Sequence, residues 1–318
     1  MKIAILEANA VNPGDLSWVC LEQFGEVAVY GDTPAEAAIA QIGDAEIVLI
    51  NKTPITAEVL DACPNIQLIC VQATGYNVVD IESAKKKGIV VTNIPAYSTN
   101  SVAQMVFAHI LNITQRVGHY ACMNRQGKWS DNADFCYWDT ELIELNDKWM
   151  GIVGFGNIGQ ATARIALSFG MKVGVFTSKA QSELPEGVKK MSLEEIFKNC
   201  DVVSLHCPLT PSTQEMVNSE RLNLMKPNAI LINTGRGPLI NEQDLADALN
   251  EGKILAAGLD VLSTEPPLST NPLLSARNCF ITPHIAWATK EARIRLMKIA
   301  VNNLNEFMKG NIINNVAK

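Results

Sequence analysis

Three ionisable residues, Arg236, Glu265 and His284, each follow an apolar, strand-like stretch of the chain. Open α/β sheets bind ligands at the carboxyl ends of their strands, so three such loops can bring these side chains to one edge. Singly, they have ordinary explanations: a surface ion pair, a solvated carboxylate and a structural histidine. Together they suit the reduction of a 2-keto acid. Arginine binds a carboxylate through two hydrogen bonds, histidine supplies a proton near neutral pH, and a neighbouring carboxylate favours and orients the imidazolium.

A glycine-rich segment near the middle of the chain indicates where a hydride donor would bind. Gly154, Gly156 and Gly159 form the pattern G-x-G-x-x-G between an apolar stretch and a helical one. Such glycines permit a tight turn, close approach of the backbone to a pyrophosphate and close helix–strand packing. The N-terminus of the following helix then faces the phosphates. The alternative is a glycine-rich turn in an ordinary βαβ unit, but the strand–turn–helix context favours a dinucleotide site.

The glycine segment opens a series of strands and helices that predicts a Rossmann domain with six strands. These strands are expected at Met150–Val153, Val173–Phe176, Val202–Leu205, Ala229–Asn233, Ala256–Asp260 and Cys279–Ile281. A long apolar segment, from Ser98 to about Asn124, is expected to be one helix that packs on this domain, with His109 and His119 in structural roles. Residues 129–147 fit neither helical nor strand periodicity and predict a loop or arm.

The first 92 residues carry a separate alternation of short strands and helices, which predicts a second parallel sheet. Its strands are expected at Lys2–Leu6, Val27–Tyr30, Ile47–Ile50, Leu68–Val71 and Val90–Val91. A last helix over Thr289–Met308 has the length to return to this domain. The fold class is therefore α/β, with two doubly wound parallel-sheet domains. We expect a Rossmann nucleotide-binding domain, residues 98–287, inserted into a flavodoxin-like substrate-binding domain made of residues 1–97 and 288–318.

Composition narrows the classes of partner. The net charge of −7 argues against nucleic acid as the main partner. The eight cysteines show no C-x-x-C pattern and no ligand spacing, so we expect reduced thiols, no metal and a cytoplasmic location. The N-terminus lacks a signal-peptide pattern, and no apolar run approaches the length of a membrane span, so no membrane association is expected.

The chain resembles the D-isomer-specific 2-hydroxyacid dehydrogenase family over essentially its whole length. The resemblance is carried by Gly154-Phe155-Gly156-Asn157-Ile158-Gly159, Asn233-Thr234-Gly235-Arg236-Gly237, Gly258-Leu259-Asp260-Val261 with Glu265-Pro266, and Thr282-Pro283-His284. It implies Arg236 as substrate anchor, Glu265 as the partner of the histidine, and His284 as the acid/base. It also implies a dimer joined through the nucleotide-binding domain.

The same resemblance implies further contacts. Cofactor contacts are implied at Asn157, Ile158, Cys207, Pro208, Thr213, Thr234, Gly235 and Asp260, with Asp260 at the nicotinamide end. Thr74 and Gly75 lie in a segment similar to the family's carboxylate-binding turn. Narrower similarities, including Asn51-Lys52-Thr53-Pro54 and Asp134-Phe135-Cys136-Tyr137-Trp138, point to the glycerate dehydrogenase/hydroxypyruvate reductase branch. They imply substrate contacts from Lys52 and, across a dimer, from Trp138. Packing at a dimer interface is the equal alternative for Trp138.

One departure from the family pattern concerns the cofactor. NAD-preferring members carry an acid at the end of the second Rossmann strand, where this chain has Thr177, followed by Ser178 and Lys179. Loss of the carboxylate removes an acceptor for the ribose 2′-hydroxyl and also removes the repulsion of a 2′-phosphate. We therefore expect NADP(H) to be favoured, with NAD(H) as the alternative if Lys179 is merely solvated.

The predicted function is D-stereospecific hydride transfer between a nicotinamide cofactor and a small 2-keto or 2-hydroxy acid, most simply as a hydroxypyruvate/glyoxylate reductase (glycerate dehydrogenase). One alternative is a reductase for bulkier 2-keto acids. Another, of a different class, is a nucleotide-sensing binding protein like the corepressors that share this fold. Fold alone does not separate these alternatives, but an intact set of Arg236, Glu265 and His284 favours the enzyme.

Overall fold

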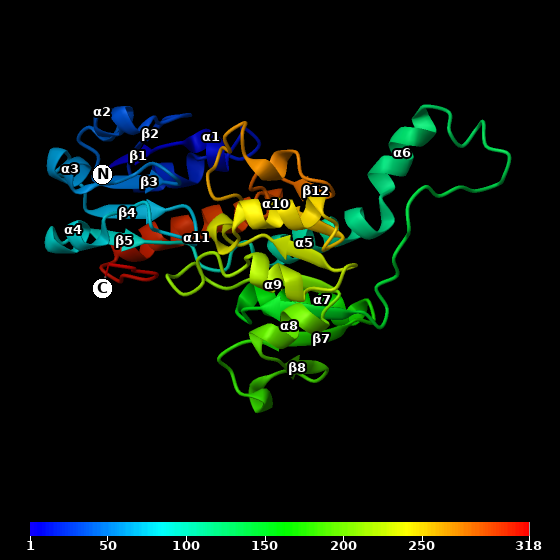
Figure 1. The fold of residues 1–318 in the computed structure, drawn as a ribbon. Helices are drawn as coiled ribbons and strands as arrows, with labels where there is room; N and C mark the ends of the chain where they lie inside the picture. The colour runs from blue at the N-terminus through cyan, green and yellow to red at the C-terminus, as the bar shows by residue number, and fades with distance from the viewer. Residues whose placement is uncertain (318) are drawn as a thin grey trace. The chain divides into compact units, whose positions relative to one another are not determined.

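The computed structural model describes residues 1–317, and the chain divides into two compact units. The first unit comprises Met1–Ser98 and Trp287–Lys318, and the second comprises Thr99–Ala286. Each of these boundaries lies one residue from the corresponding boundary expected from the sequence. Figure 1 shows the chain coloured from its N-terminus to its C-terminus.

The first unit is built on a parallel sheet with the strand order β2-β1-β3-β4-β5. This is the flavodoxin-like order, so the predicted fold class is confirmed for this unit. The strands are β1 (Lys2–Ile5), β2 (Glu26–Val29), β3 (Ile47–Ile50), β4 (Leu68–Val71) and β5 (Val90–Thr92). All four residues of β3 and of β4 are buried, as expected for central strands that are covered on both faces.

Helices cover both faces of this sheet. The short helices are α1 (Ala8–Val11), α2 (Ala38–Ile42), α3 (Ala57–Ala62) and α4 (Ile81–Lys86), with 3-10 turns η1 (Val19–Phe24) and η2 (Ala35–Ala37). The C-terminal helix α11 (Lys290–Met308) begins at Thr289, whose hydroxyl accepts a hydrogen bond from the Ala292 amide. Its apolar face, which includes Leu296 and Leu304, joins the core beneath β1 and β3.

The second unit contains a parallel sheet of seven strands in the order β12-β11-β10-β9-β6-β7-β8. The strands are β6 (Trp149–Val153), β7 (Lys172–Phe176), β8 (Val188–Lys190), β9 (Val202–Leu205), β10 (Ile230–Asn233), β11 (Ala256–Leu259) and β12 (Cys279–Ile281). Counted from β6, this is the Rossmann order, with β8 as its third strand at one edge and β12 as a seventh strand at the other edge. The expectation of six strands was wrong, because β8 is a short edge strand with only one buried residue.

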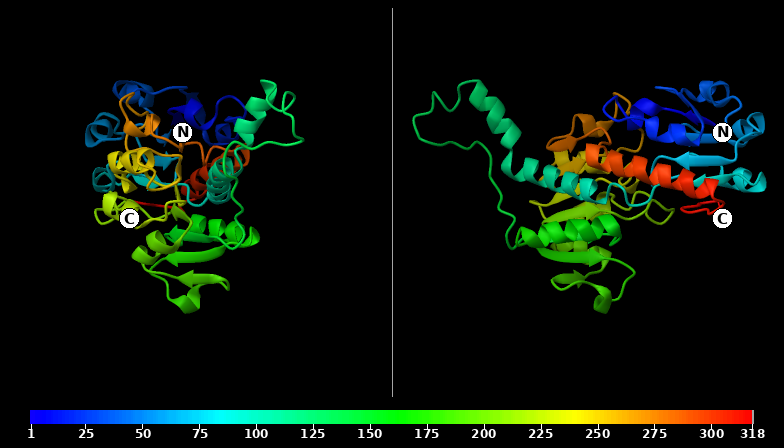
Figure 2. Two further views of the ribbon diagram at one scale, coloured as in Figure 1. Left: turned by 45° about the vertical axis from the view of Figure 1, so that its right-hand side comes forward. Right: turned by 180° about the vertical axis from the view of Figure 1, so that it is seen from behind.

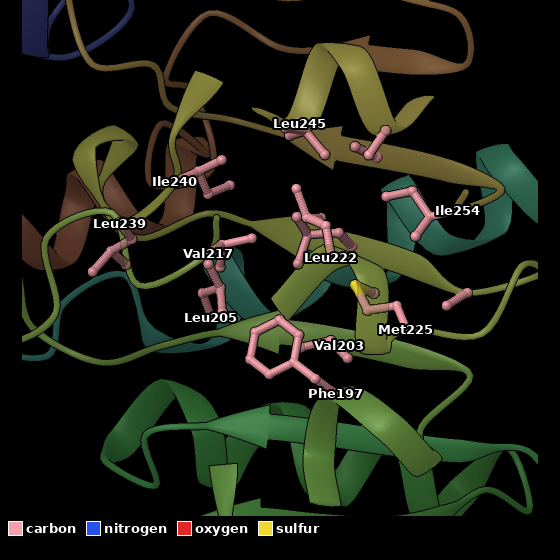
Figure 3. Close-up of a cluster of buried hydrophobic side chains, with 14 of the residues drawn as sticks. Phe197, Val203, Leu205, Val217, Leu222, Met225, Leu239, Ile240, Leu245 and Ile254 are labelled. Carbon is pink, nitrogen blue, oxygen red and sulfur yellow. The ribbon is translucent and has the colours of Figure 1, made fainter. Parts of the chain in front are cut away.

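Two hydrophobic clusters lie on the two faces of this sheet. One cluster, drawn in Figure 3, packs side chains of β9 such as Val203 and Leu205 against Phe197 and Leu222 from the covering helices. The other contains α5, where Phe107 stacks on Phe169 with 5.3 Å between ring centroids. The helices are α5 (Thr99–Gln115), α6 (Val117–Arg125), α7 (Asn157–Ser168), α8 (Leu193–Asn199), α9 (Ser219–Leu224) and α10 (Glu242–Asn250), with 3-10 turns η3 (Gln181–Glu183), η4 (Gly237–Leu239) and η5 (Pro272–Leu274).

The long segment that was expected to be one helix consists of two, α5 and α6. Arg116 between them adopts a left-handed conformation with φ of 50°, which ends α5 and redirects the chain. Helix α6 and the loop that returns to β6 extend away from the sheet of the second unit, as Figures 1 and 2 show. Residues 117–148 are called the arm below.

Candidate active site

The proposed catalytic residues of the second unit lie at one edge of its sheet. Strands β6, β9, β10, β11 and β12 pair in parallel register, with Val153 opposite Leu205, Leu205 opposite Asn233, and Leu259 opposite Ile281. The loops after these strands therefore leave from the same carboxyl edge. The glycine segment, Arg236, Asp260 and His284 are all in such loops, which is where open α/β sheets bind ligands.

The three glycines after β6 meet three different physical demands. Gly154 has φ of 97°, and a Cβ atom there would lie 2.6 Å from the backbone nitrogen of Cys207. A Cβ atom on Gly159 would lie 2.2 Å from the Gly154 carbonyl oxygen, so helix α7 packs closely on the turn. Gly156 instead faces open space, with no atom within 4 Å of the Cβ position. This arrangement leaves room for a phosphate beside Gly156 and the first turn of α7.

The turn after β10 presents Arg236 to solvent. The Asn233 side chain closes this turn by accepting a hydrogen bond from the Gly235 amide (3.0 Å) and donating one to the Arg236 carbonyl (2.8 Å). A Cβ atom on Gly237 would lie 1.9 Å from the carbonyl carbon of Leu262, so the turn packs directly on the loop that carries Glu265. The Arg236 guanidinium donates one bond to the Gly235 carbonyl and is otherwise exposed, so it can reach an anionic ligand.

Glu265 and His284 form a direct pair. Nδ1 of His284 donates to Oε2 of Glu265 over 2.6 Å, and the other carboxylate oxygen accepts the Leu262 amide over 3.1 Å. The His284 side chain is 28% exposed and the Glu265 side chain is 31% exposed. With Nδ1 committed to the carboxylate, the imidazole presents Nε2 for proton exchange with a ligand.

Asp260 directly follows β11 and is buried. Its side chain is 1% exposed, and its carboxylate accepts the Thr282 hydroxyl (2.6 Å) and the amides of Ile285 (2.9 Å) and Ala286 (2.8 Å). The structure thus shows Asp260 as an anchor for the loop around His284. A contact from Asp260 to a nicotinamide remains a prediction.

The loop after β9 contributes a polar turn and two uncharged side chains. The Thr213 hydroxyl donates to the Pro208 carbonyl (2.8 Å) and so closes the turn. Burial raises the pKa of the Cys207 thiol, which contacts the Met216 sulfur at 3.6 Å and stays protonated. Burial also lowers the pKa of His206 to about 4, so this imidazole is neutral at pH 7 beside the Ser204 hydroxyl.

The turn after β7, residues 177–180, is called the ribose turn below. The Lys179 amide donates to the Thr177 hydroxyl over 3.3 Å, the Ala180 amide donates to the Glu183 carboxylate over 2.7 Å, and the Lys179 ammonium lies 5.8 Å from the Phe155 ring centroid. Ser178 is exposed. The Lys190 ammonium donates to the Lys179 carbonyl over 2.6 Å and places a second cation at this turn. Sequence reasoning missed Lys190 because it missed β8, whose register sets Lys190 opposite Val175.

The predicted substrate residues of the first unit also lie at a carboxyl edge. Strands β3 and β4 pair with Ile50 opposite Val71, so Lys52 and Thr74 both follow strand ends. The Lys52 amide donates to the Glu7 carboxylate (2.8 Å), while its side chain is exposed. The Thr74 hydroxyl donates to the Ile94 carbonyl (3.0 Å), which fixes the turn that contains Gly75.

The arm carries most of its aromatic side chains on the surface. Trp138 is 68% exposed and Phe135 is 89% exposed. Polar bonds hold the loop to α6: the Tyr137 hydroxyl donates to the Asn124 side chain (2.6 Å), and Nε2 of His119 lies 3.0 Å from the Asp139 carboxylate. The Lys128 ammonium also donates to Asp139 (2.8 Å). Lys128 and His119 together hold the pKa of Asp139 well below its usual range. The arm is therefore ordered while its apolar groups face outward.

Neither a metal centre nor a membrane-crossing helix is found within residues 1–317. In this part of the chain, no three His, Cys, Asp or Glu side chains are grouped so that they could hold a metal ion. None of the helices described there has both the length and the apolar composition that crossing a lipid bilayer requires.

The fold and the site define a nicotinamide-dependent dehydrogenase class, and comparison with known proteins identifies the family. Residues 107–286 match the family model described as D-isomer specific 2-hydroxyacid dehydrogenase, NAD binding domain. The match covers more than half of the chain. The protein therefore belongs to the D-isomer-specific 2-hydroxyacid dehydrogenase family, and the predicted family is confirmed.

Individual relatives extend the similarity to the full length. The chain is 53% identical to a hydroxypyruvate reductase of Blautia hydrogenotrophica, over 100% of both sequences. It is 40% identical to a glycerate dehydrogenase of Methylorubrum extorquens, over 87% of each, and 36% identical to a glyoxylate reductase of Thermococcus litoralis, over 92% and 90%. Among solved structures, an acyclic imino acid reductase, Bsp5, in complex with NADPH and D-Arg matches with a TM-score of 0.85 and 31% identity, over 99% of this chain and 100% of that one.

Proposed function

We propose that this enzyme reduces a small 2-keto acid, hydroxypyruvate or glyoxylate, to the D-2-hydroxy acid, with a nicotinamide dinucleotide as hydride donor. The observation that carries the proposal is the 2.6 Å bond between His284 and Glu265 at the same sheet edge as Arg236. The names of the relatives support the choice of substrate, since they are reductases or dehydrogenases of these acids.

The residues present fit a dinucleotide. The backbone beside Gly156 is open where a pyrophosphate needs space, and the Thr234 hydroxyl at the end of β10 is buried without a hydrogen-bond partner. Such an unpartnered group is costly unless a ligand or water satisfies it. We propose that Gly154, Gly156, Asn157, Ile158 and Gly159 hold the pyrophosphate, while Cys207, Pro208, Thr213, Thr234, Gly235 and Asp260 line the path towards the nicotinamide. The bound cofactor supplies the hydride.

In this proposal each catalytic side chain has a separate task. The Arg236 guanidinium binds the substrate carboxylate. In the first unit, Lys52, Thr74 and Gly75 remain the proposed substrate contacts. As the carbonyl carbon is reduced, negative charge develops on its oxygen, and His284 donates a proton from Nε2 to that oxygen. Glu265 keeps the imidazole oriented by accepting the hydrogen bond from Nδ1.

Initial rates with four keto acids test the function. Hydroxypyruvate, glyoxylate, pyruvate and phenylpyruvate are each paired with NADPH and with NADH, and products are assigned as D or L on a chiral column. We expect kcat/KM to be highest for hydroxypyruvate or glyoxylate, with D products. Highest activity on phenylpyruvate would favour the reductase of bulkier acids. Tight cofactor binding without turnover of any keto acid would favour a nucleotide-sensing protein.

We propose further that NADP(H) is preferred over NAD(H). The ribose turn has no carboxylate at Thr177, and its Ser178 and Lys179 can hydrogen bond to a 2′-phosphate. Lys190 adds a second cation at the same turn. The solved structure of the acyclic imino acid reductase Bsp5 contains NADPH, which supports this choice of cofactor.

We also propose a homodimer joined through the nucleotide-binding domain, with the arm reaching the partner. The exposed aromatic groups of the arm support this, since apolar surface of this kind marks interaction sites. Trp138 is then positioned to shape a substrate pocket or to pack at the interface. Light scattering of the wild type against a Phe135→Ser/Trp138→Ser double variant tests it, and a wild-type monomer would refute it.

A cytoplasmic location completes the proposal. All eight cysteines are unpaired thiols in the structure, which suits a reducing compartment. Fractionation of the native host, with the enzyme assayed by hydroxypyruvate reduction, tests the location, and activity confined to an extracellular fraction would refute it.

A further inference from the structure

The backbone around His284 is fixed by one buried carboxylate. Asp260 accepts hydrogen bonds from residues on both sides of His284: the Thr282 hydroxyl before it and the amides of Ile285 and Ala286 after it. Its backbone carbonyl also accepts the His284 amide over 2.9 Å. The segment 282–286, called the histidine loop below, is thus tied to Asp260 at four points.

The conformation of His284 needs this restraint. Its φ of 54° lies in the left-handed region, which a residue with a Cβ atom seldom adopts and which persists only where surrounding contacts enforce it. The restraint also decides where Nε2 points, because the imidazole has only two side-chain torsions beyond that backbone. Any group that sets the position of Asp260 or Thr282 therefore acts on the proton donor.

His109, in helix α5, is such a group. Its Nε2 atom lies 3.2 Å from the Thr282 hydroxyl oxygen, and its side chain is only 4% exposed. The Thr282 hydroxyl has a single proton, which it donates to the Asp260 carboxylate, since an ionised carboxylate can only accept. The Thr282 oxygen must then accept from His109, so Nε2 of His109 carries the hydrogen. Burial lowers the pKa of His109, which keeps this imidazole neutral.

The packing around His109 leaves it little freedom to move. A Cβ atom on Gly258 would lie 2.7 Å from the His109 Cβ and 2.9 Å from its Cγ, so the imidazole lies directly against strand β11. Asp260 follows β11 by one residue. His109 thus contacts the strand that carries Asp260 and bonds to the hydroxyl that Asp260 accepts.

We propose that His109 is a positioning residue for the catalytic step, acting on His284 through Thr282 and Asp260. A neutral Nε2–H donor on α5 orients the Thr282 hydroxyl, which completes the hydrogen bonds to Asp260 that fix the histidine loop. The proposal rests on the proposed role of His284 as proton donor. It adds a hydrogen-bond chain that starts on a helix outside the loops of the active site.

Two matched pairs of variants test the hydrogen-bond chain from His109 to the histidine loop. His109→Gln keeps an amide donor near the position of Nε2, whereas His109→Leu keeps the volume and removes the donor. We expect kcat of His109→Leu to fall roughly 5- to 30-fold, the scale of one lost positioning bond, with KM for the keto acid changed less than about twofold because Arg236 is untouched. His109→Gln should recover most of kcat. Thr282→Val and Thr282→Ser form the second pair, with the serine retaining activity.

Two readouts separate positioning from simple structural damage. The pH profile of kcat should shift in His109→Leu, while NADPH affinity measured by fluorescence stays at the wild-type value. Nitrogen NMR of ¹⁵N-histidine-labelled protein should show a neutral histidine signal that is absent from His109→Gln and whose hydrogen is on Nε2. If His109→Leu does not fold, the Thr282 pair decides.

Several outcomes would overturn the proposal: equal kcat losses in His109→Gln and His109→Leu, unchanged kcat in His109→Leu, or a hydrogen on Nδ1 of His109. His284→Ala is measured in parallel. Near wild-type kcat in His284→Ala would refute the proposed function itself. A severe loss of kcat in His284→Ala, together with an unchanged kcat in His109→Leu, would refute only the proposed role of His109.

Discussion

The histidine loop and the ribose turn leave from the same edge of one sheet, yet they are held in opposite ways. The histidine loop is tied to a carboxylate that is 1% exposed and that accepts three hydrogen bonds. The ribose turn has a long bond between Lys179 and Thr177, one from the Lys190 ammonium, and one from the Ala180 amide to the Glu183 carboxylate (2.7 Å), and none of these acceptors is a buried carboxylate. The loop of the proposed proton donor is fixed by a buried carboxylate, and the turn proposed to select the cofactor is not.

The difference has an energetic basis. Proton transfer requires heavy-atom separations near 3 Å and aligned groups, so misplacement by about 1 Å is costly. Recognition of a 2′-phosphate is mainly electrostatic and tolerates longer, mobile cations. We therefore expect substitutions in or beside the histidine loop to cost more, and to be harder to compensate, than substitutions in the ribose turn.

The largest effect is expected from His284→Ala, which removes the fixed proton donor. We expect kcat on the best keto acid to fall roughly 10²- to 10⁴-fold, the usual scale for a positioned acid or base. Glu265→Gln, which keeps a hydrogen-bond acceptor but removes the charge, serves as the graded comparison and should lose less. Steady-state kinetics with saturating NADPH measure both, and near wild-type kcat in His284→Ala would show that the proton comes from another group.

A second large effect is expected on the free energy of unfolding at acid pH, through His206 at the same sheet edge. Burial gives His206 a folded-state pKa of about 4, below the value of about 6.5 for an unfolded histidine. The unfolded chain thus binds the proton more readily. The stability from the neutral imidazole is fully present above pH 6.5 and is lost as the pH falls through 4. Integration gives up to about 3 kcal/mol.

His206→Gln tests this value, because glutamine can still bond to Ser204 but has no ionisable group. Urea unfolding at intervals between pH 7 and pH 4 gives the free energy of unfolding for both proteins. The wild type should lose more stability over this range than the variant does. Parallel curves for the two proteins would mean that His206 keeps an ordinary pKa.

An intermediate effect is expected from Arg236→Lys, which tests how firmly the substrate anchor is fixed. Lysine keeps the charge and loses the planar pair of donors. Loss of one charge-assisted bond of about 1.5–3 kcal/mol corresponds to a decrease in kcat/KM of roughly 10- to 150-fold. We expect much of this as a raised KM for the keto acid, while the KM for NADPH is unchanged. An unaltered kcat/KM would show that Arg236 does not anchor the substrate.

The sequence predicted the elements whose patterns are local and left out those that depend on distant partners. Apolar runs such as Ile47–Ile50 and Leu68–Val71 indicated buried strands because their residues alone determine burial. Strand β8 was missed because an edge strand needs only Val188 to be buried. The break at Arg116 was missed because its left-handed φ is imposed by surrounding structure and has no signal in the residue type.

The residues of the site also divide into those predicted from local sequence and those that depend on distant partners. Arg236, Glu265 and His284 were predicted because each follows a strand, and the parallel register of β10, β11 and β12 sets those strand ends side by side. His109 was interpreted as structural, since its partner Thr282 is 173 residues further along the chain. Only the packing of α5 against β11 brings the two together, and neither segment alone shows it.

The smallest effect should come from the ribose turn, where the contrast with the histidine loop is tested most directly. Thr177→Asp restores the acid that NAD-preferring members carry, so it should accept the ribose hydroxyls and repel a 2′-phosphate. Lys179→Ala should act in the same direction by removing a cation. Each change should move the ratio of kcat/KM for NADPH over NADH by about 1–3 kcal/mol, the range for hydrogen bonds to charged groups.

Because the ribose turn is not tied to the buried Asp260 carboxylate, these two variants should change cofactor preference while leaving kcat with the better cofactor within about twofold of the wild type. Lys190→Ala provides a third measurement, since its ammonium is bonded to the Lys179 carbonyl and reaches the phosphate only if that bond yields. We expect it to have the weakest effect of the three.

A wild type that strongly prefers NADH would contradict the proposed preference before any variant is made, and it would mean that the ribose hydroxyls find an acceptor other than residue 177. A large loss of kcat in Thr177→Asp with both cofactors would instead show that the ribose turn is coupled to the histidine loop, and the contrast between the two regions would fail.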